Sequence, residues 1–289
     1  MMSIVNMIKK KQAAPLDFRR LLFLFSLLWV LVACQEEIDL DLDISQPLLV
    51  IESNLTLTPY RSGVMLSKTG GFYEFDSIQF VNDADVFISD SYGNIDTLQL
   101  YSDGIYTFTK PFLALGETYY LKVEYEGHTY TASTYIPTTV ALDTVFYHFQ
   151  ANFGPGSGPN NGSKDSLLVL NIQFDDDGDY HDYYHLLFYK NHKFYMHPYI
   201  GHYVFDDEMF NGITFPFPVR LPGFQSSDTL GIELHHITKE TFDYYRTLNN
   251  IISKRMGGGT PYNPLSNIRG GALGYFGGYG MDGKTVELK

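Results

Sequence analysis

The chain has very little cysteine: Cys34 is the single one among 289 residues. One thiol cannot form an intramolecular disulfide, so the fold must rest on its hydrophobic core, and about 250 residues after this cysteine are enough to bury one. Basic residues are also scarce, 20 against 33 acidic ones, and the formal net charge is −13. Because this excess of negative charge repels phosphates, we expect neither nucleic-acid binding nor electrostatic attachment to anionic lipid headgroups.

The apolar run at residues 21–33 is too short to cross a membrane. It has 13 residues, interrupted by Ser26, whereas a transmembrane helix needs about 20. A basic stretch precedes it, made of Lys9, Lys10, Lys11, Arg19 and Arg20. A basic segment before a short apolar one is typical of a secretory signal peptide. We expect residues 1–33 to be removed, which leaves 15 basic and 32 acidic residues and a charge of −17.

The motif around Cys34 indicates a lipid anchor. Residues 31–34, Leu-Val-Ala-Cys, resemble the bacterial lipobox, in which the cysteine is acylated with chains such as palmitate and becomes the new amino terminus. Several acyl chains are needed for stable anchoring. The alternative is a cysteine that ends a signal anchor by chance.

Residues Gln35, Glu36 and Glu37, one polar and two acidic, resemble the signal that sends Bacteroidota lipoproteins to the outer face of the outer membrane. The alternative is a solvated tether over residues 34–47. With the lipobox, this stretch predicts an outer-membrane, lipid-anchored protein that faces the cell surface.

Short alternating runs at residues 48–137 predict a β-sandwich. The clearest are 48–57, 85–90 and 118–137, the last with Glu126 and Gly127 as a two-residue hairpin turn. The stretches DGIYTF (103–108) and LGETYYLKV (115–123) resemble immunoglobulin-like or prealbumin-like modules of bacterial surface proteins. Such modules bind a partner or act as spacers more often than they catalyse a reaction.

Residues 138–289 predict a larger, aromatic-rich β domain with one amphipathic helix. Its expected strands are 142–150, 166–174, 182–191, 193–200 and 228–237. The helix is expected over 239–254, with Thr238 as its N-cap and an apolar stripe formed by Phe242, Tyr245, Leu248 and Ile252. We expect a loop at the glycine-rich stretch 154–163.

Motifs of enzyme and metal sites are mostly missing. FDDDGDYHD (174–182) suggests a calcium loop, but it lacks the EF-hand glycine and glutamate positions, so we expect an ordinary turn at Gly178 with weakly bound calcium as the alternative. The G-x-G-x-x-G at 278–283 has only six residues after it and is a false match. Histidines show no zinc spacing, although His181 and His185 could share a strand face. We therefore assign no catalytic residue, metal or cofactor, while a glycosidase pair among the many carboxylates stays open.

A tripeptide of Asp, Ser or Thr and an apolar residue recurs five times. It resembles the O-glycosylation sequon of Bacteroidota periplasmic and surface proteins. The alternative is that Asp-Thr commonly opens a strand. The candidate acceptors are Ser77, Thr97, Thr144, Ser166 and Thr229.

The carboxy-terminal stretch 260–280, TPYNPLSNIRGGALGYFGGYG, resembles a Bacteroidota outer-membrane lipoprotein family catalogued as domain of unknown function 4249. The likeness extends over nearly the whole chain. Members are often encoded beside TonB-dependent receptors, so the resemblance implies an accessory role in uptake and carries over no catalytic residue. The glycines suit a strand with close backbone approach. The motif positions are Pro264, Asn267, Ile268, Gly270, Gly271, Leu273, Gly274, Tyr275 and Phe276.

These features together predict an all-β, surface-exposed lipoprotein that acts as an accessory binding or docking component of a TonB-dependent uptake system. The expected partner is a TonB-dependent receptor, and the ligand stays open. The alternatives are a surface hydrolase acting on glycans and a structural adhesion or spacer lipoprotein.

Overall fold

The computed structural model describes residues 47–70, 78–151, 166–197, 200–254 and 262–289. The expected signal peptide, Cys34 and the acidic residues after it lie outside these ranges, as does the glycine-rich stretch 154–163. The described chain is mostly β-structure with one α-helix, α2, and this confirms the predicted all-β class. Within the same ranges, no helix combines the length and hydropathy that a membrane crossing requires.

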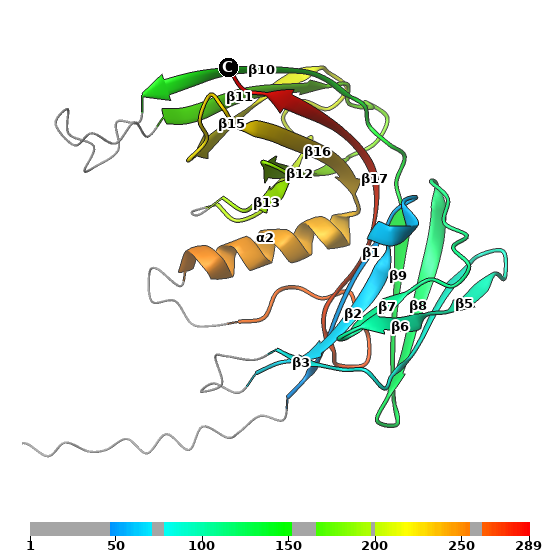
Figure 1. The fold of residues 1–289 in the computed structure, drawn as a ribbon. Coiled ribbons are helices and arrows are strands. Elements are labelled where there is room, and N and C mark those ends of the chain that lie inside the picture. The colour runs from blue at the N-terminus through cyan, green and yellow to red at the C-terminus, as the bar shows by residue number, and fades with distance from the viewer. Residues whose placement is uncertain (1–46, 71–77, 152–165, 198–199, 255–261) are drawn as a thin grey trace, which may run out of the picture. The chain divides into compact units, whose positions relative to one another are not determined.

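The strands form three sheets, and the large sheet has ten strands in the described residues (Figure 1). Its path runs β13-β12-β16-β17-β1-β2-β7-β6, while β14 pairs with β12 and β3 pairs with β2. The bounds are β1 Leu49–Leu55, β2 Gly63–Lys68, β3 Gln79–Phe80, β6 Gln99–Ser102, β7 Ile105–Thr107, β12 Tyr183–Lys190, β13 Lys193–Tyr195, β14 Tyr203–Asp206, β16 Thr229–Ile237 and β17 Leu273–Glu287. A 3-10 turn, Pro59–Arg61, lies between β1 and β2.

One long strand, β17, joins the two halves of the large sheet. Its residues 273–278 pair in parallel with β1, and its residues 279–287 pair antiparallel with β16. In Figure 1 it is the long curved red strand. A single strand therefore belongs to both halves, and Gln46–Lys289 forms one compact unit.

The four-stranded sheet, in the order β5-β4-β8-β9, packs on the β1 half of the large sheet. Its strands are β4 Asp85–Asp90, β5 Ile95–Thr97, β8 Glu117–Tyr125 and β9 His128–Ile136. The turn between β8 and β9 confirms the predicted hairpin, because Glu126 and Gly127 have φ angles of 48° and 76° and a two-residue type I′ turn needs both positive. The first core lies between the two sheets and includes Ile51, Leu66, Ile88, Leu121 and Phe276.

The three-stranded sheet, β10-β11-β15, packs on the β12–β16 half of the large sheet. Its strands are β10 Leu142–Ala151, β11 Ser166–Phe174 and β15 Phe215–Pro222. The sequence did not predict β15, which contains three prolines; it lies at the sheet edge, where a residue without an N–H is tolerated. The second core between these sheets includes Leu170, Tyr184, Phe188, Leu221 and Leu234.

Helix α2, Lys239–Lys254, contacts β12, β14 and β17 and has the predicted range. The Thr238 Oγ1 accepts a bond of 3.4 Å from the Thr241 amide, so Thr238 is the N-cap. Phe242 packs with Ile237 and Tyr279 in a small third cluster beneath the helix. The helix thus covers the face of β12 and β16 that points away from the second core.

Glycines in β17 permit close contact with neighbouring backbone. A Cβ atom on Gly274, whose φ is 96°, would lie 2.0 Å from the Ile51 carbonyl oxygen. One on Gly278 would lie 2.5 Å from the Tyr135 carbonyl oxygen. Both distances are far below contact distance, which confirms the close backbone approach expected from the glycine-rich sequence.

Three details differ from the sequence-based expectation. The strand expected at 193–200 ends at Tyr195, because the chain turns back through a bridge between His197 and Gly201. Residues 175–182 include a turn at Gly178, but they connect two different sheets and not neighbouring strands. The segment after residue 262, expected in the second domain, sends Ile268 and Phe276 into the first core.

Candidate functional site

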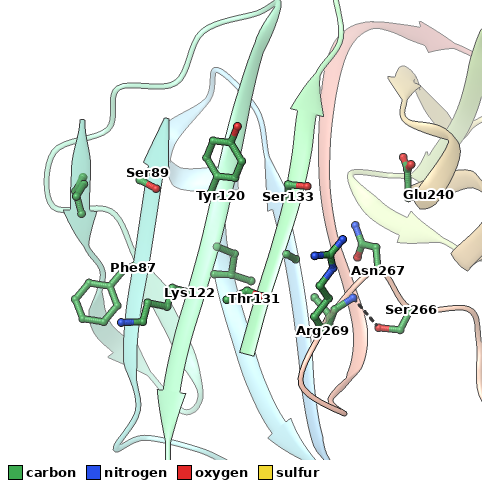
Figure 2. A pocket seen from close by; sticks show the side chains of 14 residues that line it. Phe87, Ser89, Tyr120, Lys122, Thr131, Ser133, Glu240, Ser266, Asn267 and Arg269 are labelled. Atoms are coloured by element: carbon green, nitrogen blue, oxygen red, sulfur yellow. Dashed lines mark hydrogen bonds between the residues drawn. The ribbon is translucent and has the colours of Figure 1, made fainter. Parts of the chain in front are cut away.

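A groove of about 870 Å³ lies on the outer face of the four-stranded sheet (Figure 2). Its floor comes from β4, β8 and β9, and one wall comes from residues 266–269, which precede β17. Glu240, at the start of α2, also contributes. The groove therefore combines strands from the middle of the chain with a segment near its carboxyl end.

Strand pairing arranges the floor of the groove in rows. Phe87 is opposite Lys122, and Lys122 is opposite Thr131 on the next strand. Thr131 in turn bridges to Arg269. Since side chains alternate between the two faces of a strand, Tyr120 and Lys122 point away from the core while Leu121 points into it. Figure 2 shows the outward side chains along these strands.

The wall of the groove is held by backbone contacts. Arg269 and Thr131 exchange two backbone hydrogen bonds of 2.8 and 3.1 Å. The Asn267 side chain donates to the Phe276 carbonyl at 2.8 Å and accepts from the Phe276 amide at 2.9 Å. Gly270 has a φ of 104°, and a Cβ there would lie 2.7 Å from the Thr129 carbonyl oxygen. These contacts place the Arg269 side chain at the edge of the groove.

The groove is lined by two cations, Lys122 and Arg269, and by one carboxylate, Glu240. Arg269 is exposed, and the Lys122 ammonium lies 5.5 Å from the centre of the Phe87 ring. Lys122 also forms an exposed ion pair with Glu124 at 2.7 Å, a contact of little energetic weight. Tyr120, which is 46% exposed, adds a broad aromatic surface. Such a surface suits a ligand or partner with anionic and apolar groups.

A second cavity, of about 270 Å³, lies beneath α2 and is lined by polar side chains such as Arg61, His185 and His235. The Arg61 guanidinium donates to both oxygens of Glu233, at 2.8 and 2.7 Å. Burial by itself would raise the pKa of Glu233, but hydrogen bonds from His235 and Arg61 outweigh it and lower the pKa to about 2. The Arg61–Glu233 ion pair is half-buried, and it links the turn after β1 to β16.

Comparison with family models gives a match over residues 35–285 to "Domain of unknown function (DUF4249)". The chain belongs to this family. The match includes all three sheets except the last two residues of β17, and every residue that lines the groove. No curated protein matches the chain at a significant level.

The motif residues of the DUF4249 chain lie at the wall of the groove and in the strand that follows it. Asn267 and Gly270 hold the wall, as described above. Gly271 also has a positive φ, 93°, and Pro264 is half-buried in the same segment. Tyr275 is buried beneath α2, where its hydroxyl lies 2.6 Å from the Tyr245 hydroxyl. The motif is therefore largely structural, and it brings Arg269 beside β9.

The two histidines that the sequence singled out, His181 and His185, have different surroundings. His181 lies in the loop before β12, with Nδ1 2.6 Å from Asp207 Oδ1. His185 lies within β12 and is buried beneath α2, where its Nε2 is 3.2 Å from His202 Nδ1. The two residues do not share a strand face, because β12 begins only at Tyr183.

The sequon positions have different surroundings. Thr97 is exposed, whereas Thr144 and Thr229 are half-buried. Asp96, before Thr97, is buried and accepts hydrogen bonds from the amides of residues 109 and 110. Ser77 lies outside the described residues, and Ser166 is described only by its backbone as the first residue of β11. Glycosylation stays a prediction.

Three functional candidates were not found from the sequence: Tyr120, Lys122 and Arg269. The alternation along 118–125 was a usable signal, since it places residues 120 and 122 on the polar face of the strand. For Arg269 no such signal exists, because its position depends on pairing with a strand more than 130 residues earlier.

Three aspartates, Asp176, Asp182 and Asp207, also meet, and they are the described residues best suited to hold a metal ion.

Proposed function

We propose that this chain is a lipid-anchored outer-membrane lipoprotein that docks a partner or ligand for a TonB-dependent uptake system. The lipobox at residues 31–34 supports the anchor, and the acidic residues 35–37 support export to the surface. The groove on the four-stranded sheet supports docking. In this proposal Cys34 fixes the chain to the membrane, which raises its effective concentration near other membrane proteins.

The observation that carries docking is the composition of the groove. Its volume of about 870 Å³ lies within the range typical of ligand pockets, about 300–1,000 Å³. Tyrosine and arginine are the residue types that contribute most to protein interfaces. Tyr120, on β8, and Arg269, held to β9 by two backbone hydrogen bonds, place both types at one site, so ordering their backbone costs little on binding.

The role of the motif residues also supports docking. Asn267 and Gly270 hold backbone in place and contact no reacting group, and their effect is to position Arg269. A family motif that builds the wall of a groove is more readily explained by a shared binding surface than by shared chemistry. We therefore favour a receptor loop carrying acidic and apolar side chains as the occupant of the groove.

A matched pair of tyrosines tests the proposal. Tyr120 lines the groove and is 46% exposed, whereas Tyr135 lies on the neighbouring strand β9, is 42% exposed and is not a lining residue. We expect Tyr120→Ala combined with Arg269→Ala to lower recovery of a TonB-dependent receptor after cross-linking in native membranes. The expected loss is about tenfold or more, as for central interface residues. Tyr135→Ala should leave recovery unchanged.

The opposite results point to the alternatives. If the receptor is recovered equally with both variants, the groove is not the docking surface. If no receptor is recovered with the unmodified chain, and the purified protein hydrolyses a glycan, the hydrolase interpretation replaces docking. Absence of both activities favours a spacer or adhesion role.

A further inference from the structure

Three carboxylates from two separate loops meet at one end of the second core. Asp176 and Asp182 belong to the connection between β11 and β12, and Asp207 follows β14. One oxygen of each lies within 4.8 Å of the others. We call Asp176, Asp182 and Asp207 the aspartate cluster. It lies outside the groove, and none of its members lines that site.

Most of the other oxygens in the aspartate cluster are fixed by the protein. Asp176 accepts from the Tyr184 hydroxyl at 2.5 Å and from the Gly212 amide at 2.8 Å. The Asp182 amide donates to Asp207 Oδ2 at 2.9 Å. A Cβ on either Gly178 or Gly212 would lie 3.0 Å from the Cα of the other, so the two loops are in backbone contact. The carboxylates are therefore held in place and do not lie on freely moving side chains.

One oxygen in this arrangement has no hydrogen bond. Asp207 has a fully buried side chain, and its Oδ1 finds no hydrogen-bond partner among the described residues. His181 Nδ1 is 2.6 Å away but does not meet hydrogen-bonding geometry. A buried carboxylate oxygen without a hydrogen bond is costly, because burial removes its hydration and no aligned donor replaces it. Burial raises the pKa of Asp207, and nearby Asp176 and Asp182 raise it further, against the amide of Asp182 and His181.

We propose that the aspartate cluster binds a calcium ion, with Asp207 Oδ1 as its most buried ligand. A divalent cation would supply the missing partner and neutralise three neighbouring carboxylates. An all-oxygen ligand set selects a hard cation. Calcium bonds to oxygen are about 2.3–2.6 Å long, so two ligands of one ion can be up to about 5 Å apart, and the cluster can reach one ion without movement of the loops. Water would complete the shell, and the His181 ring, 46% exposed, can turn aside.

The ligand arrangement explains why spacing along the chain argued against calcium. An EF-hand takes its ligands from one loop of 12 residues. Here two ligands come from residues 175–182 and the third from a loop about 25 residues further on. Because β12 and β14 are paired, from Tyr183 opposite Asp206 onward, the ends of these strands bring Asp182 and Asp207 together. The site is therefore created by strand pairing.

Calcium titration of the purified full chain, stripped with a chelator, tests this proposal. We expect one calcium ion per chain with a Kd of roughly 10⁻⁵–10⁻³ M, as in sensor and extracellular sites. Asp207→Asn should weaken binding at least tenfold. The control is Asp177→Asn in the same loop, since Asp177 is exposed and accepts a hydrogen bond from the Asp179 amide. It should bind like the unmodified chain.

Thermal unfolding provides a second measurement that separates a ligand from a structural residue. At calcium about 100-fold above Kd, binding to the folded state alone should raise Tm by roughly 5–10 °C. Asp207→Asn should lose this rise, yet without calcium it should be no less stable than the unmodified chain, because the amide removes a buried charge that lies beside Asp176 and Asp182. Asp176→Asn should also lose the calcium response if Asp207→Asn fails to fold.

Several results would overturn the proposal. These are no calcium binding by the unmodified chain, unchanged affinity in Asp207→Asn, or an equal loss in Asp177→Asn. An equal response to magnesium would overturn the choice of calcium, since magnesium needs shorter bonds and a stricter octahedron.

Discussion

Replacing Phe276 by Ala should destabilise both halves of the described chain together. Phe276 is fully buried in the first core, and residues 279–287 of the same strand pair with β16 in the other half. Unfolding of the first core would release β17 and remove one of the two strands that pair with β16. The sequence pattern predicted two domains divided at position 137. We expect instead that the described chain unfolds in one cooperative transition.

The size of the effect follows from burial. Truncation of a fully buried Phe to Ala costs about 3–5 kcal/mol, and truncation of a buried Leu costs about 2–5 kcal/mol. For a unit of this size each kcal/mol lowers Tm by about 2–4 °C, so Phe276→Ala should lower it by roughly 6–20 °C. Leu234→Ala, fully buried in the second core, should move the same transition in the same direction.

Differential scanning calorimetry of the purified chain measures this coupling. A single peak whose calorimetric and van't Hoff enthalpies agree supports one cooperative unit. Phe146→Ala is the control, because Phe146 lies on β10 and is 57% exposed, so its loss should change stability by less than about 0.5 kcal/mol. Two peaks, with Phe276→Ala moving one and Leu234→Ala moving the other, would refute the reasoning and favour two separate domains.

Three further predictions concern pH, membrane attachment and export to the cell surface. Burial lowers the pKa of His202 to about 4 from the ordinary 6.5. The unfolded chain therefore binds the extra proton first, and stability should fall by up to about 3 kcal/mol between pH 6.5 and pH 4. Urea unfolding at pH 7 and pH 4.5 measures this, His202→Gln should flatten the decline, and equal slopes in both proteins would contradict it. Cys34→Ala should abolish membrane retention without changing Tm, since both described cores are built from residues after position 47. An acylated variant in the membrane fraction would contradict the lipid-anchor proposal. Replacing Gln35, Glu36 and Glu37 by Ala should keep the anchor but protect the protein from protease added to intact cells, and unchanged cleavage would contradict the export signal.

Local patterns in the sequence predicted the elements that depend on neighbours in the chain. Alternation at 85–90 and 118–137 predicted β4 and the β8–β9 hairpin, and Gly127 marked its turn. Thr238 and the apolar stripe after it predicted α2. Strand β15 was missed because its prolines argue against a strand unless the edge position is known, and that position exists only in the assembled sheet.

The candidate sites were only partly visible in the sequence. The acidic stretch at 174–182 suggested a calcium loop from the sequence. Nothing singled out Asp207, because in the sequence it cannot be told from an ordinary acidic surface residue. The outward direction of Tyr120 and Lys122 followed from alternation, whereas their role depended on Arg269 coming to lie beside β9. A pattern of residue types reports which face of an element is buried and says little about which element lies across from it.

The sequence by itself therefore determined the all-β class, the helix, the main hairpin and the strand-forming glycines near the carboxyl end. The tertiary structure alone decided that β17 pairs with β1 more than 200 residues earlier and with β16, so that one strand serves both cores. It also decided that the groove and the aspartate cluster exist, since each takes residues from segments distant in the chain. The physical reason is that periodicity and turn chemistry act over a few residues, while strand pairing is selected by burial and hydrogen bonding across the whole fold.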